Sequence, residues 1–191
     1  MPDENFIEMK GHARRELEMN HAESYSLEQV AADLVDNCID AKAENVWVIF
    51  NEENYDGRRS FYIVIVDDGT GIRDEDISSV MDFGTERDYD ELDLGKFGVG
   101  LKKSSLSQAK EVTMLSKVAG GQINLRRLSS EVVVEKDQWV LIDSLREHMD
   151  TDAIGIAKRE LAELDSGSAV VLEDMHKLMN RVGDSGKREA Y

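Results

Sequence analysis

Hydrophobic and polar positions alternate along the chain in blocks that predict both helices and strands. Between Leu27 and Ala41 the apolar residues recur at the three- and four-residue spacing of one face of an α-helix. Ser26 precedes this block and Gln29 lies three residues later, so the pair forms a capping box that marks where the helix begins. The other face of the segment is acidic. We therefore expect an amphipathic helix with one buried face.

Two blocks rich in β-branched and aromatic residues follow the helix, at 45–50 and 61–66, on either side of a polar loop. Their composition predicts strands, and the loop between them predicts that they pair as an antiparallel hairpin. The pattern predicts the remaining elements in the same way. Helices are expected at 74–81, 101–109 and 156–164, and strands at 111–117, 122–128, 132–142 and 168–172.

Composition narrows the class of protein. Hydrophobic residues make up 41% of the chain and charged residues 33%, so there is enough apolar material to form a core. The formal net charge of −17 argues against nucleic acid as a direct partner, because that contact relies on Lys and Arg. The longest apolar runs are strand-sized, Cys38 is the only cysteine, and the amino terminus has no signal-peptide pattern. We expect a cytoplasmic protein without a membrane span.

The first group with candidate chemistry lies on the predicted helix. Asp33 and Asn37 are four residues apart, so they project from the same helix face. This places an acid that can orient a water molecule beside an amide oxygen that can ligate Mg²⁺. Taken alone, the pair is better explained as the solvated polar face of an amphipathic helix.

The second group is a turn, Asp67–Gly71, directly after the 61–66 strand. A carboxylate such as Asp67 can accept a hydrogen bond from an exocyclic amine like that of adenine. Gly69 and Gly71 allow backbone conformations and close ligand approach that a Cβ would block. An ordinary tight turn is also often spelled Asp-Asp-Gly, so this group alone leaves both interpretations open.

The third group, Gly95–Gly100, lies before the predicted 101–109 helix, and Lys102 follows it. Glycines at a helix entrance expose unpaired backbone N–H groups at the positive end of the helix dipole, which favours phosphate binding. The G-x-x-G-x-G spacing after a polar loop at 85–93 differs from the dinucleotide fingerprint, and the chain contains no Walker A sequence. A flexible loop that ends in a glycine turn is the alternative.

Together and in this order, these groups resemble the ATP-binding boxes of the GHKL ATPases, which include the gyrase B subunit, the large heat-shock chaperone, histidine kinases, MutL and MORC proteins. Residues 32–41 are similar to the N box, 67–71 to the D-x-G-x-G box and 94–101 to the glycine-rich lid box. The segment 166–172 resembles the late Gly-Thr strand, with Ser168 in place of threonine. The box spelling is closest to MutL, MORC and uncharacterised bacterial GHKL proteins.

This resemblance implies a fold and a domain organisation. The fold is an α+β two-layer sandwich of helices on one face of a mixed, mostly antiparallel sheet, known as the Bergerat-type ATP-binding fold. The ATP-binding domain is expected over 26–175. An amino-terminal segment, 1–25, is a candidate dimerisation strap, and 176–191 is expected to be a tail or the start of a linker to a carboxy-terminal domain.

Residue roles follow from the same resemblance. Asp67 would bind the adenine amine, Asn37 would ligate Mg²⁺, and Ser168 would help to hold Asp67 and a water molecule. The lid box would cradle the phosphates through its backbone amides. The residues expected to contact the nucleotide are Asp67, Gly69, Gly71, Ile72, Gly95, Lys96, Phe97, Gly98, Val99, Gly100, Leu101, Lys102 and Ser168.

Asp33 is the expected catalytic residue, at a position where hydrolytic members of the family generally have Glu to orient the attacking water. Asp is one methylene shorter, which leaves efficient or poor hydrolysis open. The expected function is Mg²⁺-dependent binding and hydrolysis of ATP to ADP, with closure of the 85–93 lid and nucleotide-dependent homodimerisation. One alternative is an ATP-gated interaction module with little turnover. Another is a GHKL protein kinase, although nothing in the chain is long enough to supply the phosphoacceptor hairpin.

Overall fold

The computed structural model describes residues 6–8, 13–22, 25–55, 58–81, 104–143 and 151–175. The described strands form one sheet in the order β1-β6-β5-β4-β7-β3-β2, and every neighbouring pair is antiparallel. The strands are β1 (Phe6–Glu8), β2 (Val46–Tyr55), β3 (Arg58–Asp67), β4 (Glu111–Lys117), β5 (Asn124–Ser129), β6 (Val140–Ile142) and β7 (Gly167–Glu173). The helices are α1 (Ala13–Ala22), α2 (Leu27–Asp40), α3 (Asp74–Val80), α5 (Ser130–Lys136) and α6 (Asp152–Ala162). The expected α+β class is confirmed.

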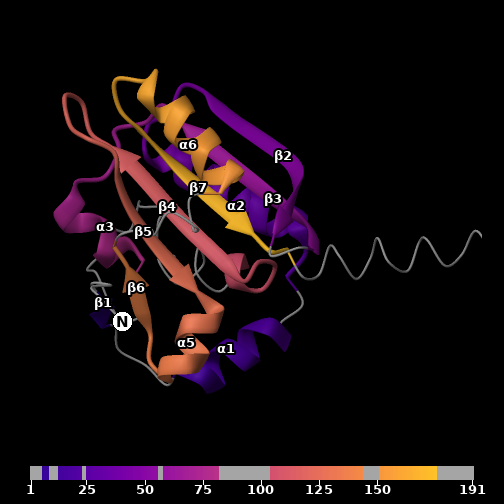
Figure 1. Ribbon diagram of the computed structural model, residues 1–191. Coiled ribbons are helices and arrows are strands. Elements are labelled where there is room, and N and C mark those ends of the chain that lie inside the picture. Colours follow the sequence, from indigo (N-terminus) through magenta and orange to yellow (C-terminus); the bar gives the residue numbers. More distant parts are fainter. Residues whose placement is uncertain are drawn as a thin grey trace, which may run out of the picture.

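Helices cover both faces of this sheet, whereas the sequence led us to expect them on one (Figure 1). Successive residues of a strand point to opposite faces, and β3 is apolar on both. Ile63 and Ile65 pack with Leu34 of α2 in one core cluster, while Val64 packs with Ala157 of α6 in the other. The sheet is therefore the middle layer between α6 and the remaining helices.

The capping box and the hairpin form as predicted. Ser26 Oγ accepts from the Gln29 amide at 3.3 Å, and Gln29 Oε1 accepts from the Ser26 amide at 2.8 Å, so α2 begins at Leu27. The strands β2 and β3 extend beyond the predicted blocks as far as the Tyr55↔Arg58 pair. Asp67 is the last residue of β3, so this long hairpin places it at the end of the sheet, beside the helix layer that contains α2.

The prediction of one strand over 132–142 is wrong, because this segment contains most of α5 followed by the short β6. Ser129 Oγ accepts from the Val132 amide, which caps the helix, and Asp137 ends it in the left-handed conformation with φ 50°. Three consecutive valines favour a strand by intrinsic propensity. The cap and the burial of Val133 in the core outweigh that propensity.

The amino-terminal segment showed no periodicity in the sequence, yet parts of it join the fold. β1 pairs with β6, and α1 packs near α5 with Ala13 and Leu17 buried. The helix predicted at 101–109 is helical at 104–106 within its described part. The lid 85–93, the box 94–101, Lys102 and the tail 176–191 lie outside the described residues. No helix in the described part of the chain is long and apolar enough to cross a membrane.

Candidate nucleotide-binding site

A polar row crosses three strands at one end of the sheet. Asp67 on β3 lies opposite Ser168 on β7, and Ser168 lies opposite Ser116 on β4. Directly opposite residues of antiparallel strands lie on the same face, so all three share the α2 face. Two positions inward the equivalent row is apolar and consists of Ile65, Val170 and Met114. The polar row therefore marks where the apolar core ends and a ligand site can begin.

Asp67 is a buried carboxyl with its own hydrogen-bond donors. Its side chain is enclosed, with 5% of the residue exposed, and Oδ1 accepts from the Gly69 amide at 2.9 Å. The Cys38 thiol lies next to it and donates to the carbonyl oxygen of Leu34 at 3.2 Å. Burial raises the pKa of Asp67, and the hydrogen bond from the Gly69 amide opposes that rise. An ionised Asp67 is thus an acceptor held in a fixed position. A further hydrogen-bond donor from a ligand would stabilise its buried charge.

The turn after Asp67 is fastened to the carboxyl end of α2. The Thr70 amide donates to the carbonyl oxygen of Ala41 at 2.9 Å. Asp68 accepts from the backbone amides of Glu44 and Asn45, each at 2.8 Å. The hydrogen bonds of Asp68 therefore hold the loop after α2, and of the two acids only Asp67 is available to bind a ligand.

Gly71 is required by the backbone at this turn. Its φ of +69° is in the left-handed region, and a Cβ there would lie 2.1 Å from the carbonyl oxygen of Lys117. The next amide, that of Ile72, donates to Ser116 Oγ at 2.7 Å. The close contact at Gly71 is thus with strand β4 of the same chain, and the predicted close approach of a ligand stays a prediction.

Asn37 and Asp33 both lie on α2, and Asn37 is the nearer of the two to this turn. Asn37 precedes Ala41 by one helical turn and Asp33 precedes it by about two, or roughly 12 Å at 1.5 Å per residue. Asn37 is exposed and Asp33 half-buried. The Asn37 amide makes no side-chain hydrogen bond to other described residues. One free amide oxygen fits Mg²⁺, which keeps several waters and binds phosphate oxygens in preference to an all-protein cage.

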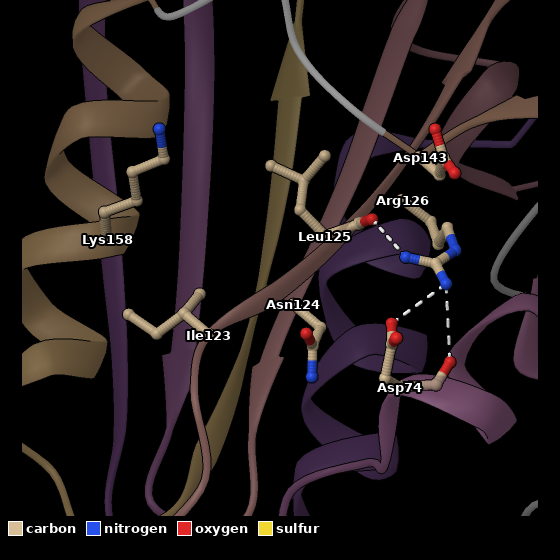
Figure 2. A pocket seen from close by; sticks show the side chains of 7 residues that line it. All are labelled: Asp74, Ile123, Asn124, Leu125, Arg126, Asp143 and Lys158. Atoms are coloured by element: carbon tan, nitrogen blue, oxygen red, sulfur yellow. Dashed lines mark hydrogen bonds and ion pairs between the residues drawn. The ribbon is translucent and has the colours of Figure 1, made fainter. Parts of the chain in front are cut away.

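Figure 2 shows a separate pocket, lined by residues of β5, α3, α6 and the turns beside them. Its volume is about 370 Å³. Arg126 crosses from β5 to α3, where it donates to the Asp74 carboxylate and to Ser78 Oγ, both at 2.9 Å. This contact holds the beginning of α3 two residues after Ile72. Among the described residues, none of those predicted to bind the nucleotide lines this pocket.

The structure brings together Asp67, Gly69, Gly71, Ile72 and Ser168 at one end of the sheet, as the resemblance implies. Asp33 and Asn37 lie on the helix that packs against this end. The predicted residues of the lid box, Gly95, Lys96, Phe97, Gly98, Val99, Gly100, Leu101 and Lys102, lie outside the described residues.

Sequence reasoning missed Ser116 and the contact of Cys38 with Asp67. Cys38 is buried, as expected for a small residue on the apolar side of α2, and its burial next to Asp67 raises the pKa of the thiol to about 12. The available signal for Ser116 was a serine next to the last residue of a predicted strand, and many strands have one there. Only the strand register identifies it as a neighbour of Ser168.

Comparison with known proteins identifies the family. Residues 25–167, more than half of the chain, match the family described as histidine kinase-, DNA gyrase B-, and HSP90-like ATPase. Mouse ATPase MORC2A and human ATPase MORC2 are each 35% identical over 88 residues, 45% of this chain and 8% of theirs. Human MORC family CW-type zinc finger protein 1 is 31% identical over 142 residues, 68% of this chain and 14% of that protein.

The chain thus spans only a small part of these relatives. The family match contains α2, the Asp67–Gly71 turn and two residues of the polar row, Asp67 and Ser116, and it ends one residue before Ser168. The resemblance inferred from the ordered boxes is confirmed by the family match and by the MORC relatives. The chain belongs to the family of histidine kinase-, DNA gyrase B- and HSP90-like ATPases.

Proposed function

We propose that this chain binds ATP with Mg²⁺ and hydrolyses it to ADP and phosphate, and that the nucleotide drives a change of shape. The observation that carries the proposal is the arrangement of three side chains. A buried acceptor, Asp67, lies beside the carboxyl end of α2, while Asn37 and Asp33 follow along that helix at one-turn intervals. Hydrolysis of ATP needs an acceptor for the base, a ligand for the metal on the phosphates and an acid that orients the attacking water, and these three side chains follow in that order.

At the base end, the Asp67 carboxylate accepts a hydrogen bond from the exocyclic amine of adenine. The hydrogen bond from the Gly69 amide to Oδ1 holds the carboxylate in place. Gly71 and Ile72 form the adjoining wall, which is fixed because the Ile72 amide is bound to β4. A pre-formed acceptor of this kind lets the site bind the base without reorganising first.

At the phosphate end, the Asn37 amide oxygen would hold Mg²⁺, which when bound neutralises phosphate charge that the acidic chain would otherwise repel. Asp33, one turn before Asn37, accepts a proton from the attacking water and orients it. Backbone amides of the glycine-rich box 94–101 bind the phosphates. Because the Asp33 side chain is shorter than Glu, the alternative of an ATP-gated interaction module, which binds ATP with little turnover, stays open.

We propose further that the 85–93 lid closes over bound ATP and that the closed form dimerises through the amino-terminal segment 1–25. Family resemblance and the order of the boxes support this step. Light scattering with and without a non-hydrolysable ATP analogue measures it directly. A molecular mass that stays that of a monomer at saturating analogue would refute the dimerisation.

Single-turnover hydrolysis with the wild type and with Asp33→Asn tests the reaction. Asp33→Asn keeps the size of the side chain and removes the base, so we expect unchanged ATP affinity and a rate lower by about 10²–10⁴-fold. Asp36→Asn, an exposed acid on the same helix, is the matched control and should keep the wild-type rate. Equal and negligible rates for all three, with ATP affinity retained, would favour the interaction module. Label transferred to a partner protein would favour the kinase.

A further inference from the structure

Strand β2 ends the sheet on one side and has no further strand beside it in the described part of the chain (Figure 1). It is ten residues long and pairs with β3 residue for residue from Val46 to Tyr55, so no bulge interrupts it. Natural edge strands are usually protected by shortness, proline, lysine or a bulge. β2 has none of these four features, whereas β1, at the opposite edge, has only three residues. β2 is therefore an edge on which another strand can pair.

The pairing with β3 identifies the backbone groups of β2 that face outward. The Asp68 amide donates to the carbonyl oxygen of Asn45, so the carbonyl group of Asn45 faces β3. Successive residues of an antiparallel strand turn their N–H and C=O groups to opposite sides. Those of Val46, Val48 and Phe50 thus point away from β3, toward the open side of the sheet.

Two side chains close the ends of this outward strip, residues 46–50. The Glu44 amide donates to Asp68 Oδ1 and the Glu52 amide to Asn51 Oδ1, each at 2.8 Å. Both amides are thereby withdrawn from pairing with an added strand. The outward strip therefore offers a short row of backbone donors and acceptors with a defined beginning and end.

The side chains of the outward strip are apolar and exposed. Val48 lies opposite Ile65 and Phe50 opposite Ile63, so both project from the α2 face of the sheet. Val48 is 56% exposed and Phe50 is 51% exposed, while Trp47, on the other face, is 41% exposed. These are three of the six large hydrophobic side chains that are exposed in the described part of the chain. An added strand would cover apolar surface on both faces as well as the open backbone groups.

Charge distinguishes between two kinds of added strand. Exposed glutamates, Glu44 and Glu52, lie just beyond the two ends of the outward strip. A second copy paired antiparallel about Val48 would place Glu44 opposite the second copy's Glu52 at each end, and like charges directly opposite destabilise a sheet. The net charge of −17 would repel a second copy further. Basic residues at the ends of the added strand would instead pair with both acids.

We propose that β2 binds an extended segment of a partner protein, which adds a strand to the sheet along the outward strip. The segment has β-branched or aromatic residues at alternate positions and basic residues at both ends. Backbone hydrogen bonds supply the affinity, and the alternate side chains with the end charges supply the specificity. The inference goes beyond the proposed function and stands without it, because no residue assigned to the nucleotide belongs to the outward strip.

The test begins with a library of nine-residue peptides built from Val, Thr, Lys and Glu, selected against the full chain without nucleotide. Selected peptides should have Val at alternate positions and Lys at both ends. The amides of Val46, Val48 and Phe50 should exchange hydrogen rapidly in the free chain. With a selected peptide at a hundred times its dissociation constant, their exchange should slow by about 100-fold. No enrichment, Glu at the ends, or amides that are already protected in the free chain would overturn the inference.

Val48→Pro removes one outward N–H, and Val48→Thr is the matched variant because it keeps the N–H and the β-branched shape. Proline is tolerated on an edge strand where its nitrogen faces outward. One backbone hydrogen bond corresponds to about a 2- to 13-fold change in affinity, so Val48→Pro should bind a selected peptide more weakly than Val48→Thr by about that factor. Equal affinities of the two variants would overturn the inference.

N-methylation of the peptide keeps the test decisive if Val48→Pro does not fold. Methyl groups on the alternate amides that face β2 should abolish binding, and methyl groups on the other alternate set should leave it unchanged. The same effect from both sets would overturn strand addition. Light scattering without nucleotide tests the second copy. A dimer that Val48→Pro dissociates would overturn the partner segment in favour of self-pairing.

Discussion

Replacement of Asp67 by Asn separates binding from stability in this fold. The two side chains have nearly the same shape, and Asn keeps one oxygen that can accept from the Gly69 amide. The other carboxylate oxygen, an acceptor, is replaced by the amide NH2 group of Asn, which is a donor. The proposed adenine amine is itself a donor, so Asp67→Asn replaces an attraction with two opposed donors at a buried position.

The expected loss of affinity follows from the group that is removed. A hydrogen bond to a charged partner contributes about 1.5–3 kcal/mol, and each 1.4 kcal/mol changes a dissociation constant tenfold. Asp67→Asn should therefore weaken ATP binding by about 10- to 150-fold. An unsatisfied pair of donors adds to this loss, so the lower figure is a minimum.

Stability should respond in the opposite way. Burial raises the pKa of Asp67 above that of the unfolded chain. A raised carboxyl pKa contributes stability below the unfolded-state pKa, and that contribution is lost as the pH rises through the folded-state pKa. At neutral pH the ionised Asp67 thus opposes folding, and Asp67→Asn should unfold at the same temperature as the wild type or higher.

Calorimetric titration with ATP and thermal unfolding at pH 7.5 and pH 5 measure both effects. The wild type should gain stability relative to Asp67→Asn as the pH falls through the folded-state pKa of Asp67, because the carboxyl takes up a proton there and the Asn amide does not. Undiminished ATP affinity in a folded Asp67→Asn protein would refute the assignment of the base acceptor. A large loss of stability at neutral pH would instead show that the carboxylate mainly holds the turn.

Two further predictions concern the buried framework. Arg127 pairs with Glu111 at 2.9 Å and with Glu173 at 3.0 Å, so Arg127→Met leaves two buried acids unpaired and should cost about 3–5 kcal/mol of unfolding free energy in a urea titration. Burial raises the pKa of both glutamates, so that cost should shrink as the pH falls and they protonate; an equal cost at pH 5 and 7.5 would contradict this. Gly71→Ala should lose at least about 1–2 kcal/mol from its left-handed φ and weaken ATP binding, whereas a fully stable variant would show that the turn adapts.

Local patterns determined much of this protein. The capping box and apolar spacing placed α2, and the alternating blocks placed the β2–β3 hairpin, because both depend on residues close together in the chain. The ordered boxes also identified Asp67 and Ser168, which the sheet then places opposite each other. Short-range chemistry is visible in sequence because its partners are a few residues apart.

Tertiary structure alone decided the rest. The valine-rich segment became α5 because the core accepted Val133 on a capped helix, and α6 packed on the second face because β3 is apolar on both. The polar row of Asp67, Ser168 and Ser116 depends on two pairings, β4 with β7 and β7 with β3, that join residues about fifty to one hundred positions apart. Such pairings are set by the competition of whole strands for neighbours, and no local window of the sequence contains both partners.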